Sequence, residues 1–481
     1  MDYEISKTDE NEKEIQKLLS EKKGKLKHGK KKSSLTFYNS TRYLILIISI
    51  LCCTTVFANS LSLNFTIICM INENYDKNET TFNNSTLKEQ QNVTKYYSFS
   101  AGQKAWLFSA VALGTFIGAV PLTFITSKVG IRIVFTIYGL ISAFSTLFLP
   151  IAASISYPFL FSMRVFQGIA SAVLFAASGS ILAEIFLMPI AGIFCDSNFG
   201  WQGIYYLQGS LTFAFFVLFF LFYRNSPKKH RNVGEKELLL LNEGKDESEH
   251  KNTKQSKIPY TKMIKDKSVL GVWIGAIGSF TGFQLFLQYG PTFLNKVLKI
   301  NVAKTGIVGA IPFLGALIVK GLSGPLSDRL TFISQKRRCQ IFCSISQFSM
   351  AFCIATLGWM PIKSEIFAQI CFSAAIMFSS LNVVGLIKSA QLQSRQYAHI
   401  VMNVIAFINS GIILFLPLFI STFAPNNTYT EWAIIFYSIA ILVTVTTTIF
   451  NITCEAEPRP WTFENSNESS KEDKSIKLRP A

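Results

Sequence analysis

Charged side chains are scarce in this sequence of 481 residues. Asp, Glu, Lys and Arg make up 16% of the chain, whereas hydrophobic residues make up 49% and phenylalanine alone occurs 43 times. A soluble domain carries a larger share of charge and has no need of so much apolar surface. The deficit therefore excludes an ordinary soluble protein and favours a membrane protein.

The apolar residues gather in ten long runs from which charges are nearly absent. A helix needs about 20 such residues to cross the hydrocarbon core of a bilayer. We therefore predict an all-α, polytopic membrane protein. A typical cleavable signal peptide is also lacking, because the first 40 residues are polar and rich in lysine, and we expect the first run to act as a signal anchor. The runs are 44–71, 105–125, 133–154, 204–223, 269–287, 305–318, 339–360, 366–387, 400–423 and 432–453.

Histidine is rare, and its positions exclude several chemistries. The four histidines, His28, His230, His250 and His399, fall in expected loops or at the boundary of a run. A Ser/His/Asp nucleophile or a proton relay through an intramembrane histidine would need one in a pocket. The nine cysteines lie mostly inside runs without CxxC or paired spacing, so we expect them to act as small apolar residues. We predict no enzyme, no metal and no cofactor, and leave Na⁺ or H⁺ open as a coupling ion.

The net charge of +17 is concentrated in loops and tails. Lys and Arg beside membrane spans mark cytoplasmic loops, so this pattern predicts topology and no nucleic-acid partner. Both termini are then cytoplasmic, and segment 72–102 is extracytoplasmic. Four glycosylation sequons in that segment independently indicate the same side. They begin at Asn78, Asn83, Asn84 and Asn92.

The hydrophilic segment 224–268 divides the chain near its middle. We predict a lysine-rich tail 1–42, a helical bundle 43–223 with a glycosylated loop 72–102, a cytoplasmic linker 224–268, a second bundle 269–454 and a cytoplasmic tail 455–481. A weak repeat supports two halves: the stretches 123–128 and 324–329 both place a polar residue and a cation after the second span of a half. Repeats of this kind are typical of transporters.

At these residues the chain resembles the major facilitator superfamily, and more closely its anion:cation symporter branch. That branch includes type I phosphate cotransporters, sialin and the vesicular glutamate transporters. The resemblance covers about residues 42–462 and implies twelve membrane helices in two bundles of six. The motifs that carry it are 164–168, 189–192, 200–206, 289–293, 304–306, 324–329 and 455–461.

The 324–329 motif corresponds to the family's Gly-x-x-x-Asp-Arg loop signature. We expect Gly324 to let two helices approach closely, and Asp328 and Arg329 to form ion pairs or cap helix ends. The resemblance implies that this cluster latches one end state of the transport cycle. Gly324, Asp328 and Arg329 are therefore our candidate gating residues.

Arg164 is the strongest candidate for contacting a substrate. An arginine two turns into a span is costly unless it faces a cavity or a partner, and its planar guanidinium suits a carboxylate or phosphate. The alternative is a structural arginine bonded to carbonyl groups of neighbouring helices. Asn59, Ser60 and Gln284 also lie within spans, where they either line a cavity or form helix-to-helix hydrogen bonds.

Two departures from the resembling family bear on function. The second-span histidine of the vesicular glutamate members falls near Phe108, and the first-span arginine of many anion carriers falls at Ser60. In addition, about a span's worth of residues is missing between Ile181 and Pro189. A single crossing by 158–195 would invert every later loop, so we expect two short crossings or a longer true transcript.

The leading hypothesis is secondary active transport of an organic or inorganic anion by alternating access, as ion-coupled symport or exchange. The alternatives are a transporter-like receptor or scaffold that no longer transports, and a carrier of neutral or cationic solutes. We expect a monomer in the lipid bilayer of the plasma membrane or of endolysosomal or vesicular membranes. Glu14, Leu18 and Leu19 resemble an acidic dileucine sorting signal, although a short solvated helix is the alternative.

Overall fold

The computed structural model describes residues 41–70, 97–173, 177–226, 232–233, 237–238, 259–359 and 365–463, in which it has helices and no strand. Two compact units divide the chain: Met1–Leu44 with Arg224–Lys245, and Ile45–Tyr223 with Asp246–Ala481. In the first unit the Thr41 hydroxyl donates to the Asn232 carbonyl oxygen at 2.9 Å, and the Arg42 amide donates to Glu237 Oε1 at 2.7 Å. The predicted sequons and the predicted sorting signal lie outside the described residues, as do most residues of the predicted linker.

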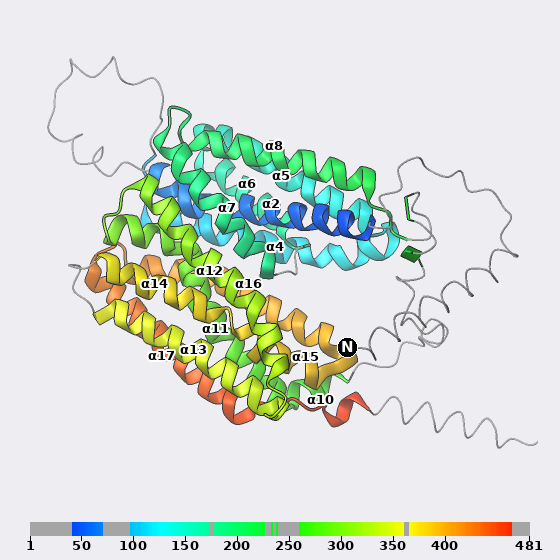
Figure 1. Cartoon of the computed structure of the whole chain (residues 1–481). Coiled ribbons are helices and arrows are strands. Elements are labelled where there is room, and N and C mark those ends of the chain that lie inside the picture. Colours follow the sequence, from blue (N-terminus) through cyan, green and yellow to red (C-terminus); the bar gives the residue numbers. More distant parts are fainter. Residues whose placement is uncertain are drawn as a thin grey trace, which may run out of the picture. The chain divides into compact units, whose positions relative to one another are not determined.

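A first group of helices is formed by the earlier half of the chain (Figure 1). Polar caps fix two of its helix starts: Ser100 and Gln103 form a capping box, and the Ser156 side chain accepts from the Phe159 amide. Gly130, at φ 89°, makes the turn between two helices that a side chain would strain. The members are α2 (Thr41–Met70), α4 (Ala101–Val129), α5 (Ile131–Ile155), α6 (Tyr157–Ser171), α7 (Ala177–Asp196) and α8 (Gly200–Phe222).

A second group is formed by the later half. Asn301 caps one of its helices, and Thr428 with Glu431 forms a capping box on another. The members are α10 (Tyr260–Lys265), α11 (Lys267–Thr292) with η2 (Phe293–Val297), α12 (Val302–Arg329), α13 (Gln335–Trp359), α14 (Glu365–Ser379) with η3 (Val383–Ile387) and α15 (Lys388–Ser394), η4 (Arg395–Tyr397), α16 (Ala398–Phe423), α17 (Tyr429–Thr453) and η5 (Pro460–Thr462).

The predicted membrane segments are confirmed as helices. Each of the ten apolar runs falls on a helix, and nine helical stretches among the described residues are long and apolar enough to cross a membrane. One of these stretches, Glu365–Phe423, contains two segments, α14–α15 and α16. Adding the shorter α6 and α7, which are not among these candidate spans, gives twelve helical segments among the described residues, the number that the fold class implies.

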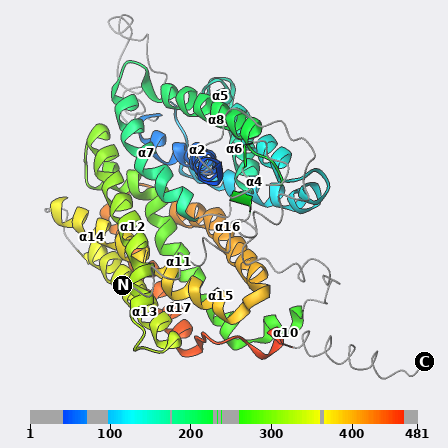
Figure 2. The ribbon, with the colours of Figure 1, turned by 45° about the vertical axis from the view of Figure 1, so that its right-hand side comes forward.

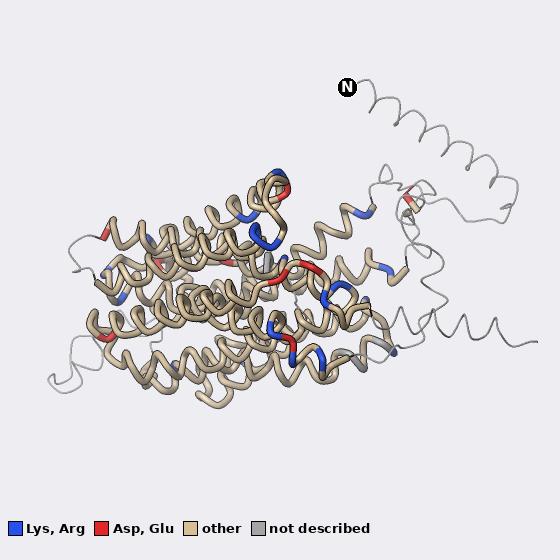
Figure 3. Tube along the Cα trace, turned by 90° about the horizontal axis from the view of Figure 1, so that it is seen from below, with Lys and Arg blue, Asp and Glu red and all other residues tan. Residues whose placement is uncertain are grey.

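The helix ends gather at two opposite ends of the larger unit. At one, which we call the disulfide end, Cys69 of α2 is bonded to Cys195 of α7. This pairing corrects the expectation that the cysteines serve only as small apolar residues. At the other, which we call the basic end, lie Lys128, Arg132, Arg329 and Arg338. Figure 3 shows Lys and Arg concentrated toward one end of the helices.

Helices α6 and α7 form a hairpin that enters and leaves at the disulfide end. The Tyr157 hydroxyl at the start of α6 donates to the Gln103 carbonyl oxygen near the start of α4, and Cys195 near the end of α7 carries the disulfide. Two short helices therefore replace the single crossing that would have inverted the second half. The structure has two short helices in 158–195, as the first alternative expects; the two membrane crossings and the alternative of a longer transcript stay predictions.

The two groups of helices meet within the larger unit along α7 with α12 and along α4 with α16. Figure 2 shows both pairs side by side. Small residues allow the first contact: a Cβ on Gly306 would lie 2.5 Å from the Met188 carbonyl oxygen, and one on Gly192 would lie 3.1 Å from that of Ala303. Phe116 stacks on Phe407 in the second contact, with ring centroids 5.9 Å apart. The exact limits of the predicted domains stay a prediction.

Candidate functional site

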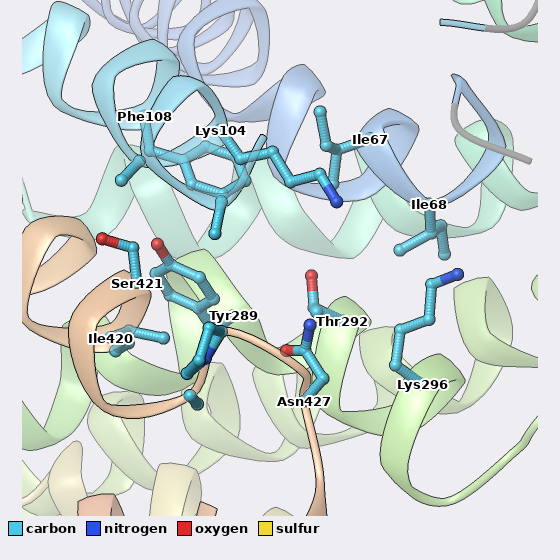
Figure 4. Close-up of a pocket in the computed structure, with 14 residues that line it drawn as sticks. Ile67, Ile68, Lys104, Phe108, Tyr289, Thr292, Lys296, Ile420, Ser421 and Asn427 are labelled. Atoms are coloured by element: carbon cyan, nitrogen blue, oxygen red, sulfur yellow. The ribbon is translucent and has the colours of Figure 1, made fainter. Parts of the chain in front are cut away.

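A pocket of about 60 Å³ lies between the two groups near the disulfide end (Figure 4). Its apolar wall includes Phe108 and Tyr289, whose rings meet edge to face with centroids 5.2 Å apart. The lining comes from both halves of the chain and from helix ends at the disulfide end. It consists of Ile67, Ile68, Ala101, Lys104, Ala105, Phe108, Tyr289, Thr292, Lys296, Ile420, Ser421, Ala424, Pro425 and Asn427.

Two lysines supply the charge of this pocket. Lys104 lies in the first turn of α4 and Lys296 lies on η2, so each group of helices contributes one. Figure 4 shows both side chains reaching toward Ile67 and Ile68 of α2. Each lysine also makes at least one further interaction of its own. Among the described residues the lining contains two lysines and no Asp or Glu.

Hydroxyl groups complete the polar part of the lining. The Thr292 Oγ1 atom is buried and makes no hydrogen bond to any described residue. The Tyr289 side chain presents its hydroxyl from the neighbouring turn of α11, and Ser421 lies on α16 (Figure 4). A buried hydroxyl without a partner costs stability, so it is a site for a ligand or water to satisfy. Ser421 Oγ donates to the Leu418 carbonyl oxygen at 2.9 Å, so the unpaired hydroxyl shown among the described lining residues is that of Thr292. A cation beside an unpaired hydroxyl suits an oxyanion.

Arg164 does not line this pocket. It is 1% exposed, and it donates from Nη1 to the Ser60 carbonyl oxygen and to Gln167 Oε1, both at 2.8 Å, and from Nε to the Leu107 carbonyl oxygen at 3.3 Å. These contacts tie α6 to α2 and α4, as expected of a structural arginine bonded to carbonyl groups of neighbouring helices. Nη2 donates to no described residue, so contact with a substrate through that nitrogen stays a prediction.

The other predicted substrate residues also bond to neighbouring helices. Asn59 Nδ2 donates to the hydroxyls of Ser142 and Thr212, both at 2.9 Å, and Ser60 pairs with the Ser171 hydroxyl at 2.6 Å. Gln284 Nε2 donates to Asn409 Oδ1 at 2.9 Å, joining α11 to α16. The structure does not bring Asn59, Ser60 or Gln284 to the pocket. Their polar atoms serve helix packing in this conformation.

The predicted gating cluster lies at the basic end. Asp328 forms an ion pair with Lys388 at 2.8 Å, which confirms the expected ion pairing and joins α12 to α15. Arg338 donates to the Ser327 carbonyl oxygen at 2.9 Å, whereas Arg329 is exposed. The expected close approach at Gly324 is wrong: no described atom lies within 4 Å of the position of a Cβ there. Its gating role stays a prediction.

The sequence gives little sign of the pocket. Lys104 and Lys296 each stand next to a span at the level of a membrane surface, where a lysine usually does no more than reach for water. Phe108, near which the resembling vesicular glutamate transporters carry a histidine, does line the pocket. That correspondence is the one signal in the sequence that pointed here.

The fold and this pocket define a class: a polytopic helical transporter whose site lies between two groups of helices. The sequence pattern described as Major Facilitator Superfamily matches residues 45–187 and 179–395. The chain belongs to that superfamily, and it is a secondary active transmembrane transporter of the alternating-access type.

Curated relatives cover nearly the whole chain. Human sialin is 22% identical, over 89% of this chain and 92% of its own length. Sodium-dependent phosphate transport protein 1 of Oryctolagus cuniculus is 23% identical, over 89% of this chain and 96% of its own length. Vesicular glutamate transporter 2.2 of Danio rerio is 24% identical, over 71% of this chain and 62% of its own length. These relatives confirm the resemblance to the anion:cation symporter branch.

Solved structures share the fold. A bacterial homologue of the lysosomal transporter Spinster, in an inward-facing conformation, superposes with a TM-score of 0.59 at 13% identity over 86% of this chain and 97% of that chain. The inward-open xylose transporter XylE from E. coli superposes with a TM-score of 0.56 at 13% identity over 86% and 100%. At these identities the likeness concerns the fold alone.

Proposed function

We propose that this transporter carries a small organic or inorganic anion and that the pocket between α4 and η2 receives it. The observation that carries the proposal is the pair Lys104 and Lys296, one from each group of helices, in a lining whose described residues include no acidic side chain. Closure of the two groups around an anion would bring both charges to it. The names of the relatives support this class, since they state phosphate, urate and glutamate.

The proposed orientation places the disulfide end outside the cytoplasm. Disulfides persist in oxidising compartments, and cytoplasmic loops are rich in Lys and Arg. Cys69–Cys195 and the basic residues occupy opposite ends of the helices, so both rules support the same orientation. The termini are then cytoplasmic, and glycosylation at Asn78, Asn83, Asn84 or Asn92 would occur at the disulfide end. Mutation of all four sequons tests this orientation, because the variant should no longer show the change in gel mobility that deglycosylation causes in the wild-type protein.

The charge of the pocket can be tested by neutralising its lysines. Lys104→Gln and Lys296→Gln should each lower uptake of the transported anion by about tenfold, because a hydrogen bond to a charged group contributes roughly 1.5–3 kcal/mol. Uptake of labelled phosphate, urate, glutamate and xylose into liposomes containing the purified protein is the measurement. Lys299→Gln is the matched control, since Lys299 is an exposed lysine two residues beyond η2 that does not line the pocket.

The results separate the candidate functions. Uptake of at least one anion that falls in both pocket variants and stays normal in Lys299→Gln supports the proposal. Uptake of xylose in preference to every anion would make the protein a carrier of neutral solutes. Anion binding without flux would favour the transporter-like receptor. Residence in the plasma membrane or in endolysosomal or vesicular membranes, a monomeric state, and roles for Arg164 and the Glu14, Leu18 and Leu19 signal are further proposals.

A further inference from the structure

Glu184 is a buried carboxyl group that the proposed anion pocket does not use. It is 1% exposed on α7, and its Oε1 atom makes no hydrogen bond to any described residue. The residues one turn away on the same helix include Ile181, Leu187 and Met188, all buried and apolar. Glu184 lies about 18 Å along the axis of α7 from Asp196, the last residue of that helix. Glu184 is therefore deep in the membrane segment. An ionised carboxylate without a partner is costly there, so the neutral acid is favoured.

No charge lies at the level of Glu184 on the two helices that contact α7 most. The contacts of Gly306 and Gly309 with Met188 place Glu184 opposite the region of Phe313 on α12. Lys304 and Lys320 are then each about 10 Å or more away along the helix axis, and Asp328 and Arg329 are farther. The other helix, α8, contacts α7 where Gly203 lies against Phe194. Counted along both helices from this contact, Tyr205 and Tyr206 lie about two turns from the level of Glu184.

The position of Glu184 links its protonation to movement. It lies on the helix that packs against α12 of the other group, one turn beyond the tight contact between Met188 and Gly306. Closing the two helices removes the carboxyl group from water, whereas separating them would let water reach it. The closed pair therefore excludes the ionised form, and the open pair can accept it.

We propose that Glu184 binds and releases the coupling proton of the transport cycle. The carboxylate takes a proton from water on one side to form an O–H bond, the α7–α12 contact closes over the neutral acid, and the same proton returns to water on the other side. This inference rests on the proposed transport function for its role in coupling. A sodium site is disfavoured, because a hard cation needs a cage of oxygen ligands and, one turn away on α7, the Ser180 hydroxyl is the single polar side chain beside the apolar Ile181, Leu187 and Met188.

Infrared difference spectra between wild type and variant, recorded in the same buffer, test the proton site without any substrate. Spectra of the purified protein in neutral and mildly acidic buffer should contain a carboxylic C=O band from a buried acid. That band should be lost in Glu184→Gln and kept in Glu365→Gln, an exposed acid at the start of α14. Because glutamine imitates the neutral acid, Glu184→Gln should be at least as heat-stable as wild type. Absence of the band from wild type, or a clear loss of stability in Glu184→Gln, would overturn the proposal.

Uptake measurements test the coupling. With phosphate, urate or glutamate as the labelled probe, wild-type uptake should change by up to about tenfold per pH unit of imposed gradient, since one proton is linked to each cycle. In Glu184→Gln the response to the pH gradient should disappear, while Glu365→Gln should behave as wild type. A response to the gradient that persists in Glu184→Gln, or uptake driven by Na⁺ alone, contradicts the proposal. If no anion is transported but the infrared band depends on Glu184, the proposed function fails and the proton site stands.

Discussion

Gly306 of α12 lies against the main chain of Met188 of α7, so closely that a methyl group on Gly306 would be 2.5 Å from the Met188 carbonyl oxygen. The two residues belong to different halves of the chain, and Gly306 is part of the 304–306 motif. Their contact needs a residue without a side chain at 306, because any Cβ would force the helices apart. This helix pair is one of the two along which the halves meet.

The first prediction concerns that contact. Gly306→Ala should lower the free energy of unfolding by about 1–3 kcal/mol, because added volume in a tight contact has to displace backbone. Gly321→Ala on the same helix is the matched control, since open space surrounds Gly321 and both variants gain the same helix propensity. Thermal unfolding in detergent is the measurement. Equal stability of the two variants would mean that α7 and α12 do not pack as described.

A second prediction concerns Arg164. Because its guanidinium ties α6 to the main chains of α2 and α4, Arg164→Ala should lower stability by about 2–4 kcal/mol and reduce abundance in the membrane. Arg132→Ala, which removes a half-buried arginine bonded to the Phe220 carbonyl oxygen, should cost less. Wild-type stability of Arg164→Ala combined with lost uptake would instead make Arg164 a ligand of the anion.

The disulfide gives a third prediction. Cys69 and Cys195 close a loop across 126 residues, and removing such a bond typically costs about 2–4 kcal/mol. Cys69→Ser should therefore lower the unfolding temperature, whereas Cys371→Ser, which removes a buried free cysteine from α14, should change it less. Mass spectrometry of unreduced digests should find the linked peptides. Free thiols at both positions in mature protein would contradict the pairing and the proposed orientation.

Asp266 gives a fourth prediction, on pH. Burial alone would raise the pKa of Asp266, but hydrogen bonds from Arg459 at 2.7 Å, from the Trp461 indole at 2.9 Å and from the Ser268 amide outweigh it and leave the pKa below its ordinary value. A lowered folded-state pKa stabilises the protein above the unfolded-state pKa of about 3.9, and this contribution is lost as the pH falls through the folded-state value.

The corresponding variant is Asp266→Asn, which should unfold at a lower temperature than wild type in neutral buffer. The difference should shrink as the buffer is acidified below about pH 4, where the unfolded state takes up a proton on Asp266, and should vanish once the pH passes the lower folded-state pKa. Glu365→Gln controls for loss of an exposed acid. A difference between wild type and Asp266→Asn that stays constant across the whole range would show that the charge on Asp266 does not hold the Arg459–Trp461 segment.

Particular residues show what the sequence could and could not predict. The apolar runs predicted the helices because hydrocarbon selects residues by transfer free energy, which is local and needs no knowledge of neighbours. Arg164 and Gln284 were identified as buried polar residues, but their partners depend on which helices cross them. Lys104 and Lys296 come together from positions 192 residues apart only because α4 and η2 reach the same end of the fold. Such a meeting leaves no spacing in the sequence.

The most direct test of anion transport is counterflow in liposomes that contain the purified protein. Vesicles loaded with unlabelled phosphate, urate or glutamate should accumulate the same labelled anion transiently from a dilute external solution, because an alternating-access carrier returns to the outside loaded. We predict accumulation with at least one of these anions, and none with Lys104→Gln/Lys296→Gln. No counterflow with any anion, or counterflow that the double substitution leaves unchanged, would contradict the account.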